Sequence, residues 1–309
     1  MKPVIFAGSA SKQLGTRIAA NHNFNLGQQE LINFANSEIR IRVLDSVLNK
    51  DCLIVQSTSN PTNDNFIQLF FLLDALKREK PTKVKVLIPY FGYARQNIKH
   101  RYGECVSMRV IAQILENLKA DEIITIDIHK KSSQAFFSIP FKNLSALPML
   151  AKKVYKDLKV STIEEDKFVI GSPDQGGIQR AKDFVNHFYL QNKQRDIAVV
   201  EKKRNINKIH ESKSIKLFGD VKNKTVILID DVSTSGKTIL NAAEICLKFN
   251  AKEVYAVVVH ADFAFGVPKL IEKSVLKKFY TTNTIEKTLE DLTDYSKIQV
   301  LDISKIFAL

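Results

Sequence analysis

The feature that most constrains the fold is the alternation of short apolar runs with longer amphipathic segments. The runs are rich in valine and isoleucine and have the length of buried strands: KPVIFAG, CLIVQST, KVKVLIPY, EIITIDI, KFVIGSP, DIAVVEK, TVILIDD, EVYAVVVH and FYTTNTI. Helix-length segments lie between many of them, and one of these places Phe66, Leu69, Leu73 and Leu76 on a single face. This pattern predicts an α/β fold, in which mainly parallel sheets are flanked by helices.

The alternating series runs twice, which predicts two domains. The first series ends near EIITIDIHK, and the second begins at KFVIGSPDQGG after a stretch that contains Pro148 and the acidic residues 164–166. A chain of 309 residues suits two domains of roughly 100–200 residues each. We therefore expect an N-terminal domain over residues 1–147 and a C-terminal domain over residues 148–309.

Composition limits the cellular setting. No apolar run approaches the ~20 residues that span a bilayer, and the apolar part of the N-terminus suits a first strand better than a secretory signal. The three cysteines and six histidines are scattered, without the spacing of a zinc site or a disulfide framework. We expect a reducing, cytoplasmic setting and no membrane partner.

The net charge of +13 allows three interpretations. It could reflect nucleic-acid binding, a site for multiply phosphorylated small molecules, or a lysine-rich solvated surface. The lysines are spread along the whole chain, with no arginine-rich arm and no aromatic residues interleaved with basic ones. Nucleic acid is therefore the weakest of the three, and no nucleic-acid partner is expected.

The stretch VILIDDVSTSGKTI, residues 226–239, is predicted to join a strand to a helix at the carboxyl edge of a sheet. Backbone N–H groups of such a loop and the helix N-terminus form an anion site. The loop adds hydroxyl donors from Ser233, Thr234, Ser235 and Thr238. Gly236 permits close approach of the backbone, so the loop predicts a phosphate site.

Two acids, Asp230 and Asp231, come directly before this loop. The SGKT sequence suggests a nucleotide-triphosphatase loop, but that motif needs a glycine where Asp231 stands. Carboxylates repel phosphate, yet they accept hydrogen bonds from vicinal hydroxyls or orient Mg²⁺. Ribose 5-phosphate, with a phosphate at one end and neighbouring hydroxyls at the other, meets both demands. The alternative is a polar strand-to-helix turn closed by a capping Ser or Thr.

The same stretch resembles the phosphoribosyl-binding loop of the phosphoribosyltransferase fold. Transferases share that loop with the diphosphokinases that make their substrate, and other segments separate the two groups. In chain order these are NSEIRIRVLDSV, IPYFGYARQNIKHR, TIDIHKKSSQAFF, SPDQGGIQRAKDF and TTNTI. Together they resemble the ribose-phosphate diphosphokinases over nearly the whole chain. The resemblance implies two tandem phosphoribosyltransferase-like domains, with ATP on the N-terminal side and ribose 5-phosphate on the C-terminal side.

The resemblance also implies a reaction and an ATP site. The diphosphoryl group of ATP passes to O1 of ribose 5-phosphate, and AMP leaves. The matching ATP-binding positions are Phe34, Asn36, Glu38, Arg95 and Gln96. Arginine offers a planar fork to phosphate and glutamine a donor and an acceptor to adenine, although Arg95 and Gln96 taken alone also fit a solvated turn. In that family a neighbouring subunit completes the adenine pocket, which implies self-association, with a hexamer expected.

Four further residues carry the implied metal and catalytic roles. His129 and Asp174 match the family's Mg²⁺ ligands; the alternatives are a structural histidine and a helix-capping aspartate. Lys202 and Arg204 match the cations of a flap that closes over the reacting phosphates. Cations that arrive on closure stabilise charge in the transition state. The alternative for this segment is an exposed basic loop.

The implied ribose 5-phosphate site combines the acid pair and the loop. Asp230 and Asp231 match the positions that hold the ribose hydroxyls. The positions that match the 5-phosphate site are Thr234, Ser235, Gly236, Lys237 and Thr238. The common form of the loop reads Asp-Asp-x-x-Asp-Thr-x-Gly-Thr, so here Thr234 replaces a third acid and Lys237 adds a positive charge.

Two other functions stay open. A catalytically silent regulatory homologue would be expected to lose the metal ligands or the flap cations, but His129, Asp174, Lys202 and Arg204 are all present. A phosphoribosyltransferase would need a base-binding hood and would not need the Ala-Arg-Gln or Asp-x-His segments. An active diphosphokinase is the leading hypothesis.

Overall fold

The computed structural model describes residues 2–190, 195–202, 215–286, 292 and 294–307 of the chain. The chain divides into two compact units. Unit 1 comprises Met1–Ser145, Asn283–Lys287 and Asp302–Leu309, and unit 2 comprises Ala146–Thr282 and Thr288–Leu301. The main division thus lies close to the predicted boundary at residue 147, but two C-terminal segments expected in the second domain belong to unit 1.

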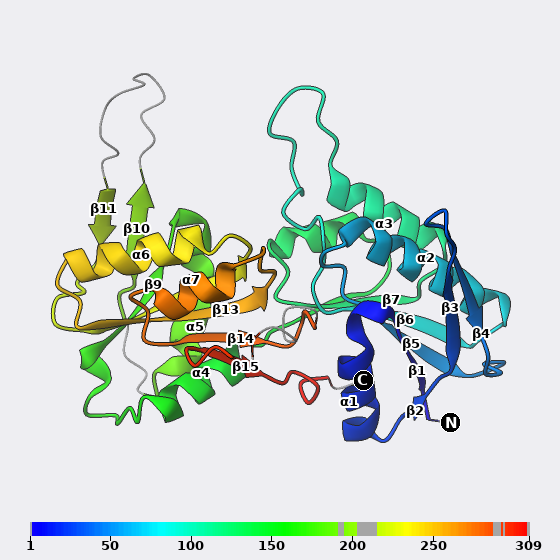
Figure 1. Ribbon diagram of the computed structural model, residues 1–309, viewed down its shortest axis with the longest axis horizontal. Helices are drawn as coiled ribbons and strands as arrows, with labels where there is room; N and C mark the ends of the chain where they lie inside the picture. The colour runs from blue at the N-terminus through cyan, green and yellow to red at the C-terminus, as the bar shows by residue number, and fades with distance from the viewer. Residues whose placement is uncertain (1, 191–194, 203–214, 287–291, 293, 308–309) are drawn as a thin grey trace. The chain divides into compact units, whose positions relative to one another are not determined.

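The core of unit 1 is a parallel six-stranded sheet in the order β2-β1-β5-β6-β7-β8 (Figure 1). Its strands are β1 (Val4–Ala7), β2 (Asn25–Leu26), β5 (Asp51–Val55), β6 (Lys83–Ile88), β7 (Glu122–Ile126) and β8 (Phe141–Leu144). The central strands are buried on both faces, which is why their sequences are continuously apolar rather than alternating. The predicted α/β class with parallel sheets is confirmed.

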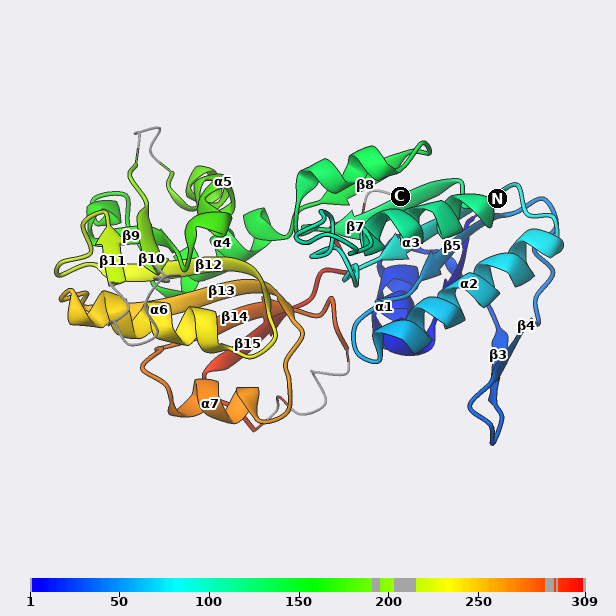
Figure 2. The ribbon, with the colours of Figure 1, turned by 90° about the horizontal axis from the view of Figure 1, so that it is seen from above.

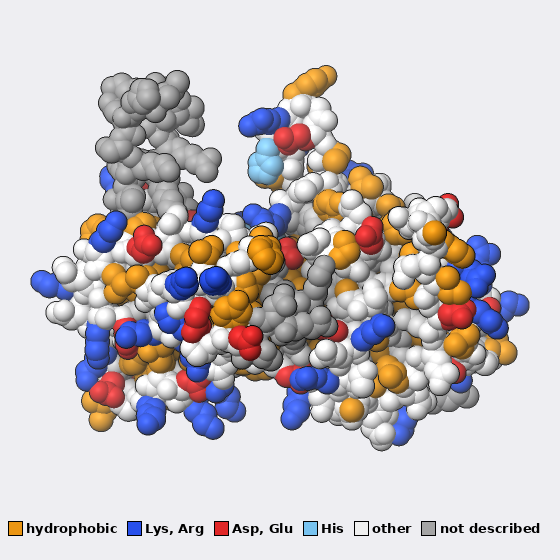
Figure 3. All heavy atoms as spheres, in the orientation of Figure 1, with side chains coloured by type: hydrophobic (Ala, Val, Ile, Leu, Met, Phe, Trp, Pro, Cys, Tyr) orange, Lys and Arg blue, Asp and Glu red, His pale blue; other side chains and the backbone are white. Residues whose placement is uncertain are grey.

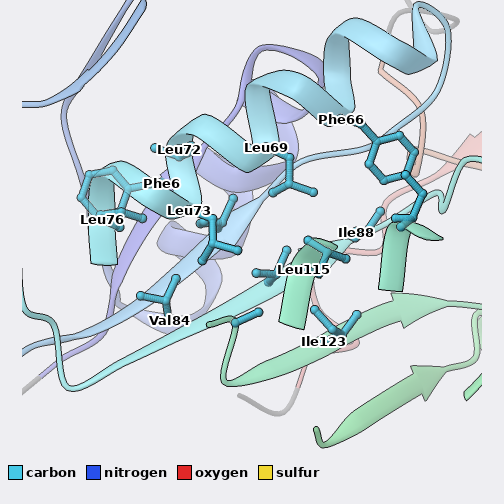
Figure 4. Close-up of a cluster of buried hydrophobic side chains, with 14 of the residues drawn as sticks. Phe6, Phe66, Leu69, Leu72, Leu73, Leu76, Val84, Ile88, Leu115 and Ile123 are labelled. Atoms are coloured by element: carbon cyan, nitrogen blue, oxygen red, sulfur yellow. The ribbon is translucent and has the colours of Figure 1, made fainter. Parts of the chain in front are cut away.

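Three α-helices cover this sheet on its two faces: α1 (Lys12–His22), α2 (Thr62–Arg78) and α3 (Ser107–Asn117). Helices α2 and α3 pack on the face that carries Phe6 and Ile54, where leucines of α2 such as Leu69 point at the strands (Figure 4). Successive strand residues face opposite sides. Gly15 of α1 lies against Ala7, so α1 covers the other face.

A separate antiparallel hairpin, β3 (Gln29–Asn33) and β4 (Ile39–Val43), extends unit 1. Its second strand alternates exposed arginines with half-buried Ile41 and Val43, which pack against the same apolar core. The segment NSEIRIRVLDSV, which carries part of the family resemblance, thus contains β4 of this hairpin.

The two C-terminal segments join unit 1 through polar contacts. The carboxylate of Glu286 accepts hydrogen bonds from the backbone N–H groups of Gln13 and Leu14, at the first turn of α1. Asn283 Nδ2 donates to Asp302 at 2.8 Å. The Glu286 contacts are favourable because a negative charge is stabilised at a helix N-terminus. They hold a C-terminal segment against α1, which is distant in the sequence.

Unit 2 contains a seven-stranded sheet in the order β11-β10-β9-β12-β13-β14-β15, parallel except for the edge pair β10–β11. The strands are β9 (Phe168–Ser172), β10 (Ala198–Lys202), β11 (Ile215–Phe218), β12 (Thr225–Ser233), β13 (Glu253–Ala261), β14 (Phe279–Thr282) and β15 (Ile298–Leu301). The helices are α4 (Leu147–Asp157), α5 (Ile178–Phe188), α6 (Lys237–Lys248) and α7 (Val267–Lys273). Figure 2 shows α6 and α7 on one face of the sheet and α4 and α5 on the other. Short 3₁₀ turns complete the two units: η1 (Ser9–Ser11), η2 (Lys131–Phe136), η3 (Glu165–Lys167) and η4 (Gln175–Gly177).

Two surface properties concern possible partners. Within the described part of the chain, every helix is too short or too polar to cross a bilayer. On the face in Figure 3, Lys and Arg side chains are scattered among acidic and apolar ones. That face therefore carries no continuous basic stripe among its described residues.

Candidate functional site

The predicted phosphate loop lies at the carboxyl end of β12, where α6 begins. Gly236 has φ +71°, a left-handed conformation, and a Cβ there would lie 3.2 Å from Val267 Cγ1, so only glycine fits without strain. The Ala264 N–H donates to the carbonyl oxygen of Thr234 at 2.8 Å, which fixes the loop against the segment after β13. The loop side chains of Thr234, Ser235, Lys237 and Thr238 are exposed. The structure therefore brings the predicted residues together on one accessible loop.

In the acid pair before this loop, Asp231 is buried, Asp230 is half-buried, and both lie beside one cation. The Asp230 side chain is 17% exposed and that of Asp231 is 5% exposed. Arg180 Nη1 lies 3.1 Å from Asp231 Oδ1 and 3.6 Å from Asp230 Oδ1. Burial, reinforced by the neighbouring Asp231 charge, raises the pKa of Asp230 well above its ordinary value, while Arg180 opposes that rise.

Arg180 was not among the site residues predicted from the sequence. It lies in the first turn of α5, in the SPDQGGIQRA element, and reaches across to β12 because α5 packs on β9 and β12. The sequence signal for this residue is an arginine that follows the glycine turn at the start of a helix. That signal places Arg180 near the acid pair only because β9 and β12 are adjacent strands.

Asp174 lies in the turn between β9 and α5 and is exposed. Its Oδ1 accepts a hydrogen bond from the Gly177 N–H at 3.1 Å, and Ser172 Oγ donates to its carbonyl oxygen at 2.6 Å. The capping interaction weighed as an alternative is therefore present. It engages one carboxylate oxygen of an exposed side chain, so a metal role stays a prediction.

Unit 1 contains a cavity of about 690 Å³ at the ends of β5 and β6. It is lined by Asn60, Pro61, Thr62, Asn63, Asp64, Tyr90, Gly92, Tyr93, Arg95 and Gln96. The structure thus brings the predicted residues Arg95 and Gln96 into one pocket. Gln96 Oε1 accepts a hydrogen bond from Ser107 Oγ at 2.6 Å, which orients the amide.

The other predicted nucleotide-binding residues lie elsewhere in unit 1, at the exposed tip of the β3–β4 hairpin. Phe34 is 44% exposed, with the guanidinium of Arg40 6.0 Å from its ring centroid. Asn36 Oδ1 accepts from the Glu38 N–H at 3.2 Å, so this oxygen closes the turn. Phe34, Asn36 and Glu38 are not among the residues that line the cavity.

His129 follows β7 in unit 1 and is half-buried. The adjacent structure is tightly held, because buried Asp127 accepts from Ser145 Oγ at 2.7 Å. Among the residues that the structure describes, no group of three or more His, Cys, Asp or Glu side chains could hold a metal. A metal at His129 or Asp174 would need further ligands from a bound molecule or water.

Of the two predicted catalytic cations, Lys202 is the last residue of β10. The backbone of Lys202 pairs with Ile215 of the antiparallel β11. Arg204 lies outside the described residues. In the sequence, the basic segment predicted to form a flap begins where β10 ends.

The comparisons with known proteins agree over almost the whole length. The model for the N-terminal domain of ribose phosphate pyrophosphokinase matches residues 3–118, and that for the phosphoribosyl synthetase-associated domain matches residues 178–309. The ribose-phosphate pyrophosphokinase of Fusobacterium nucleatum is 34% identical over 304 residues, which are 98% of this chain and 92% of that protein. Ribose-phosphate pyrophosphokinase 1 of Streptococcus pneumoniae is 34% identical over 302 residues, covering 98% of this chain and 90% of the relative.

A solved structure matches the whole architecture. The crystal structure of phosphoribosylpyrophosphate synthetase from Mycobacterium smegmatis has a TM-score of 0.88 and 29% sequence identity to this chain. The match covers 98% of this chain and 95% of the other.

Proposed function

The chain belongs to the ribose phosphate pyrophosphokinase family and is a diphosphotransferase; we propose that it transfers the diphosphoryl group of ATP to O1 of ribose 5-phosphate, giving 5-phosphoribosyl 1-diphosphate and AMP. O1 forms a bond to the β-phosphorus while that phosphorus separates from the oxygen that bridges it to the α-phosphate. The O1 proton passes to solvent. Positioning and charge stabilisation supply most of the catalysis in such transfers.

One observation carries this proposal. At one end of β12, a buried acid pair with its own arginine adjoins an exposed, hydroxyl-rich loop at the start of a helix. Asp230 and Asp231 accept hydrogen bonds from the ribose hydroxyls. Residues 234–238 bind the 5-phosphate with backbone N–H groups, hydroxyls and the Lys237 ammonium.

Gly236→Ala is expected to raise KM for ribose 5-phosphate several-fold and to lower the free energy of unfolding by about 1–2 kcal/mol, because alanine is strained in the left-handed region. Ribose 5-phosphate saturation at fixed ATP and urea unfolding measure the two effects. Gly103→Ala is the matched control, since Gly103 has φ +86° and open space around its Cβ position. A similar stability loss with unchanged KM is expected there. Equal KM changes in both variants would contradict a phosphate role for the loop.

The nucleotide is assigned to unit 1. The 690 Å³ cavity is within the usual range of about 300–1,000 Å³ for small-molecule sites, and Arg95 supplies a cation to it. The exposed hairpin tip binds the nucleotide of a neighbouring copy through Phe34, Asn36 and Glu38. The protein is accordingly a homo-oligomer, a hexamer in this proposal.

Asp174 in unit 2 and His129 in unit 1 are each assigned as an Mg²⁺ ligand. The exposed Asp174 carboxylate is the hard oxygen donor that Mg²⁺ prefers, whereas imidazole suits other metals better. A single protein ligand fits an ion that keeps waters and binds substrate phosphates in addition. When bound, Mg²⁺ neutralises charge on the transferring phosphates. Lys202 and Arg204 add positive charge when the segment after β10 closes.

Release of AMP tests the function. The protein is incubated with ATP, ribose 5-phosphate and Mg²⁺, and AMP is quantified by chromatography. AMP formation that requires all three components is expected. A folded protein that releases none would favour the regulatory homologue, and consumption of 5-phosphoribosyl 1-diphosphate with a nucleobase would favour a phosphoribosyltransferase.

A further inference from the structure

The geometry around the acid pair is unusual for two consecutive strand residues. Side chains of neighbouring residues on a strand point to opposite faces, yet Asp230 and Asp231 both reach the same Arg180 nitrogen. The Asp231 N–H donates to Asp230 Oδ1 at 2.8 Å, which turns the Asp230 carboxylate back along the chain. One guanidinium group therefore serves two converging carboxylates.

The position of Arg180 is itself well defined. Its side chain is 14% exposed. The turn before α5 is held by the contacts of Asp174 with Ser172 and Gly177, and a Cβ on Gly177 would lie 2.6 Å from Ser172 Oγ. The start of α5 thus packs closely against β9, and the Arg180 guanidinium group lies at the end of β12.

We infer that Arg180 is a positioning residue for ribose 5-phosphate, which favours the ionised form of both carboxylates and directs them at the sugar hydroxyls; this assignment rests on the proposed function. An ionised carboxylate only accepts hydrogen bonds, whereas a protonated one presents a donor to the hydroxyl. Two close, buried acids without a counter-charge do not both stay ionised near neutral pH. Arg180 acts through the pair and has no assigned contact with substrate.

Other charged groups occupy the neighbouring elements. The charged or titratable residues on or next to the elements packed against β12 include Asp174 before η4, Asp183 on α5, Lys237 on α6, and His260 and Asp262 at the end of β13. Asp183 accepts a hydrogen bond from Gln179 at 2.9 Å, and His260 is buried. All of them are present in both the wild type and an Arg180 variant. Dividing KM of the variant by KM of the wild type at each pH therefore removes the contribution from the titration of these groups and of the substrate phosphate.

Arg180→Gln removes the charge and tests the inference. KM for ribose 5-phosphate at pH 7 is expected to rise about tenfold, while KM for ATP changes less than about twofold. The acid limb of kcat/KM for ribose 5-phosphate is expected to move up by about 1–2 pH units, since an adjacent cation lowers a carboxyl pKa by that order. The ratio of KM for ribose 5-phosphate in Arg180→Gln to that in the wild type should then fall as pH rises towards 9, because both carboxylates are ionised there even without Arg180. A merely structural defect would give a ratio that is constant with pH.

Two further variants make the outcome decisive. Lys182→Gln, an exposed charge loss on the same helix, is expected to leave KM and the acid limb unchanged. Arg180→Lys keeps the positive charge, so its acid limb should stay within about 0.3 pH unit of the wild type. If circular dichroism shows Arg180→Gln to be unfolded, Arg180→Lys decides. An acid limb of kcat/KM that moves by a full pH unit in Arg180→Lys overturns the inference. An acid limb that does not move, together with a raised KM for ribose 5-phosphate, supports it.

The possible failures are separable. Wild-type protein that forms no AMP overturns the proposed function and this role together. If the wild-type protein forms AMP, two results overturn the role of Arg180 alone. One is a ratio of KM in Arg180→Gln to KM in the wild type that stays constant from pH 6 to pH 9. The other is an Arg180→Gln variant whose KM and acid limb equal those of Lys182→Gln.

Discussion

Lys202→Ala is expected to lower kcat by about 10³-fold, because a cation aimed at transition-state charge is worth about that much in phosphoryl transfer. KM for ATP and for ribose 5-phosphate should change by less than about threefold, since the proposed contact forms only on closure. Initial rates over a matrix of both substrate concentrations give all three parameters.

Lys216→Ala provides the control for this substitution. Lys216 is an exposed lysine on the adjacent strand β11, paired in register with Glu201, and its loss should leave kcat within about twofold. If Lys202→Ala raised KM as much as it lowered kcat, the lysine would already contact the substrate in the ground state. The closing-flap role would then be wrong.

Asp231→Ala is expected to damage both binding and stability. Removing an acceptor for a ribose hydroxyl should lower kcat/KM for ribose 5-phosphate by about 10–100-fold. Breaking the 3.1 Å contact with Arg180 leaves a buried charge without its nearer partner, which costs about 3 kcal/mol of unfolding free energy. Saturation kinetics and urea unfolding measure the two losses.

Asp230→Asn should behave in the opposite sense for stability. The pKa of Asp230 is raised in the folded protein above its ordinary value of 3.8, so the ionised carboxylate destabilises the fold. That penalty is absent below pH 3.8, where the group is protonated in both states, and it grows as pH rises towards the raised pKa. The Asn variant should therefore be the more stable protein at pH 7, and its advantage should vanish as pH falls towards 4. Equal destabilisation of Asp230→Asn and Asp231→Ala at pH 7 would contradict the shared-cation arrangement.

The parallel sheets were predictable because their signal is local. Each central strand is a run of Val, Ile and Leu that is buried on both faces, as in TVILI of β12. The β3–β4 hairpin was harder to predict. Its tight turn depends on Ser37 in a left-handed conformation, φ +71°, and no Asn-Gly or Asp-Gly pair announces it.

The C-terminal segments show where local patterns end. FYTTNTI was predicted as one strand, but β14 stops at Thr282. Asn283 and Glu286 instead find partners in unit 1, more than 270 residues away for Glu286. Such pairings follow from the tertiary fold, and no periodicity in the segment itself encodes them.

The candidate site was predictable where residues are consecutive. The acid pair and phosphate loop follow one another in sequence, so predicting the strand and the helix was enough to place them together. Arg180 reaches the same place from another element, which requires the order of the strands. Arg95 and Gln96 share a cavity with residues 60–64 for the same reason, because β5 and β6 are neighbours.

In the proposed reaction, the diphosphoryl group leaves ATP as a unit and becomes bonded to O1 of a sugar phosphate at the end of β12. The direct test uses ATP labelled with ³²P on both the β- and γ-phosphates, together with ribose 5-phosphate and Mg²⁺, and follows the label by chromatography. Both labels are expected to appear together on the phosphoribosyl product, with one AMP formed per product. Label found as inorganic phosphate or as a monophosphorylated sugar, accompanied by ADP, would contradict the proposed reaction.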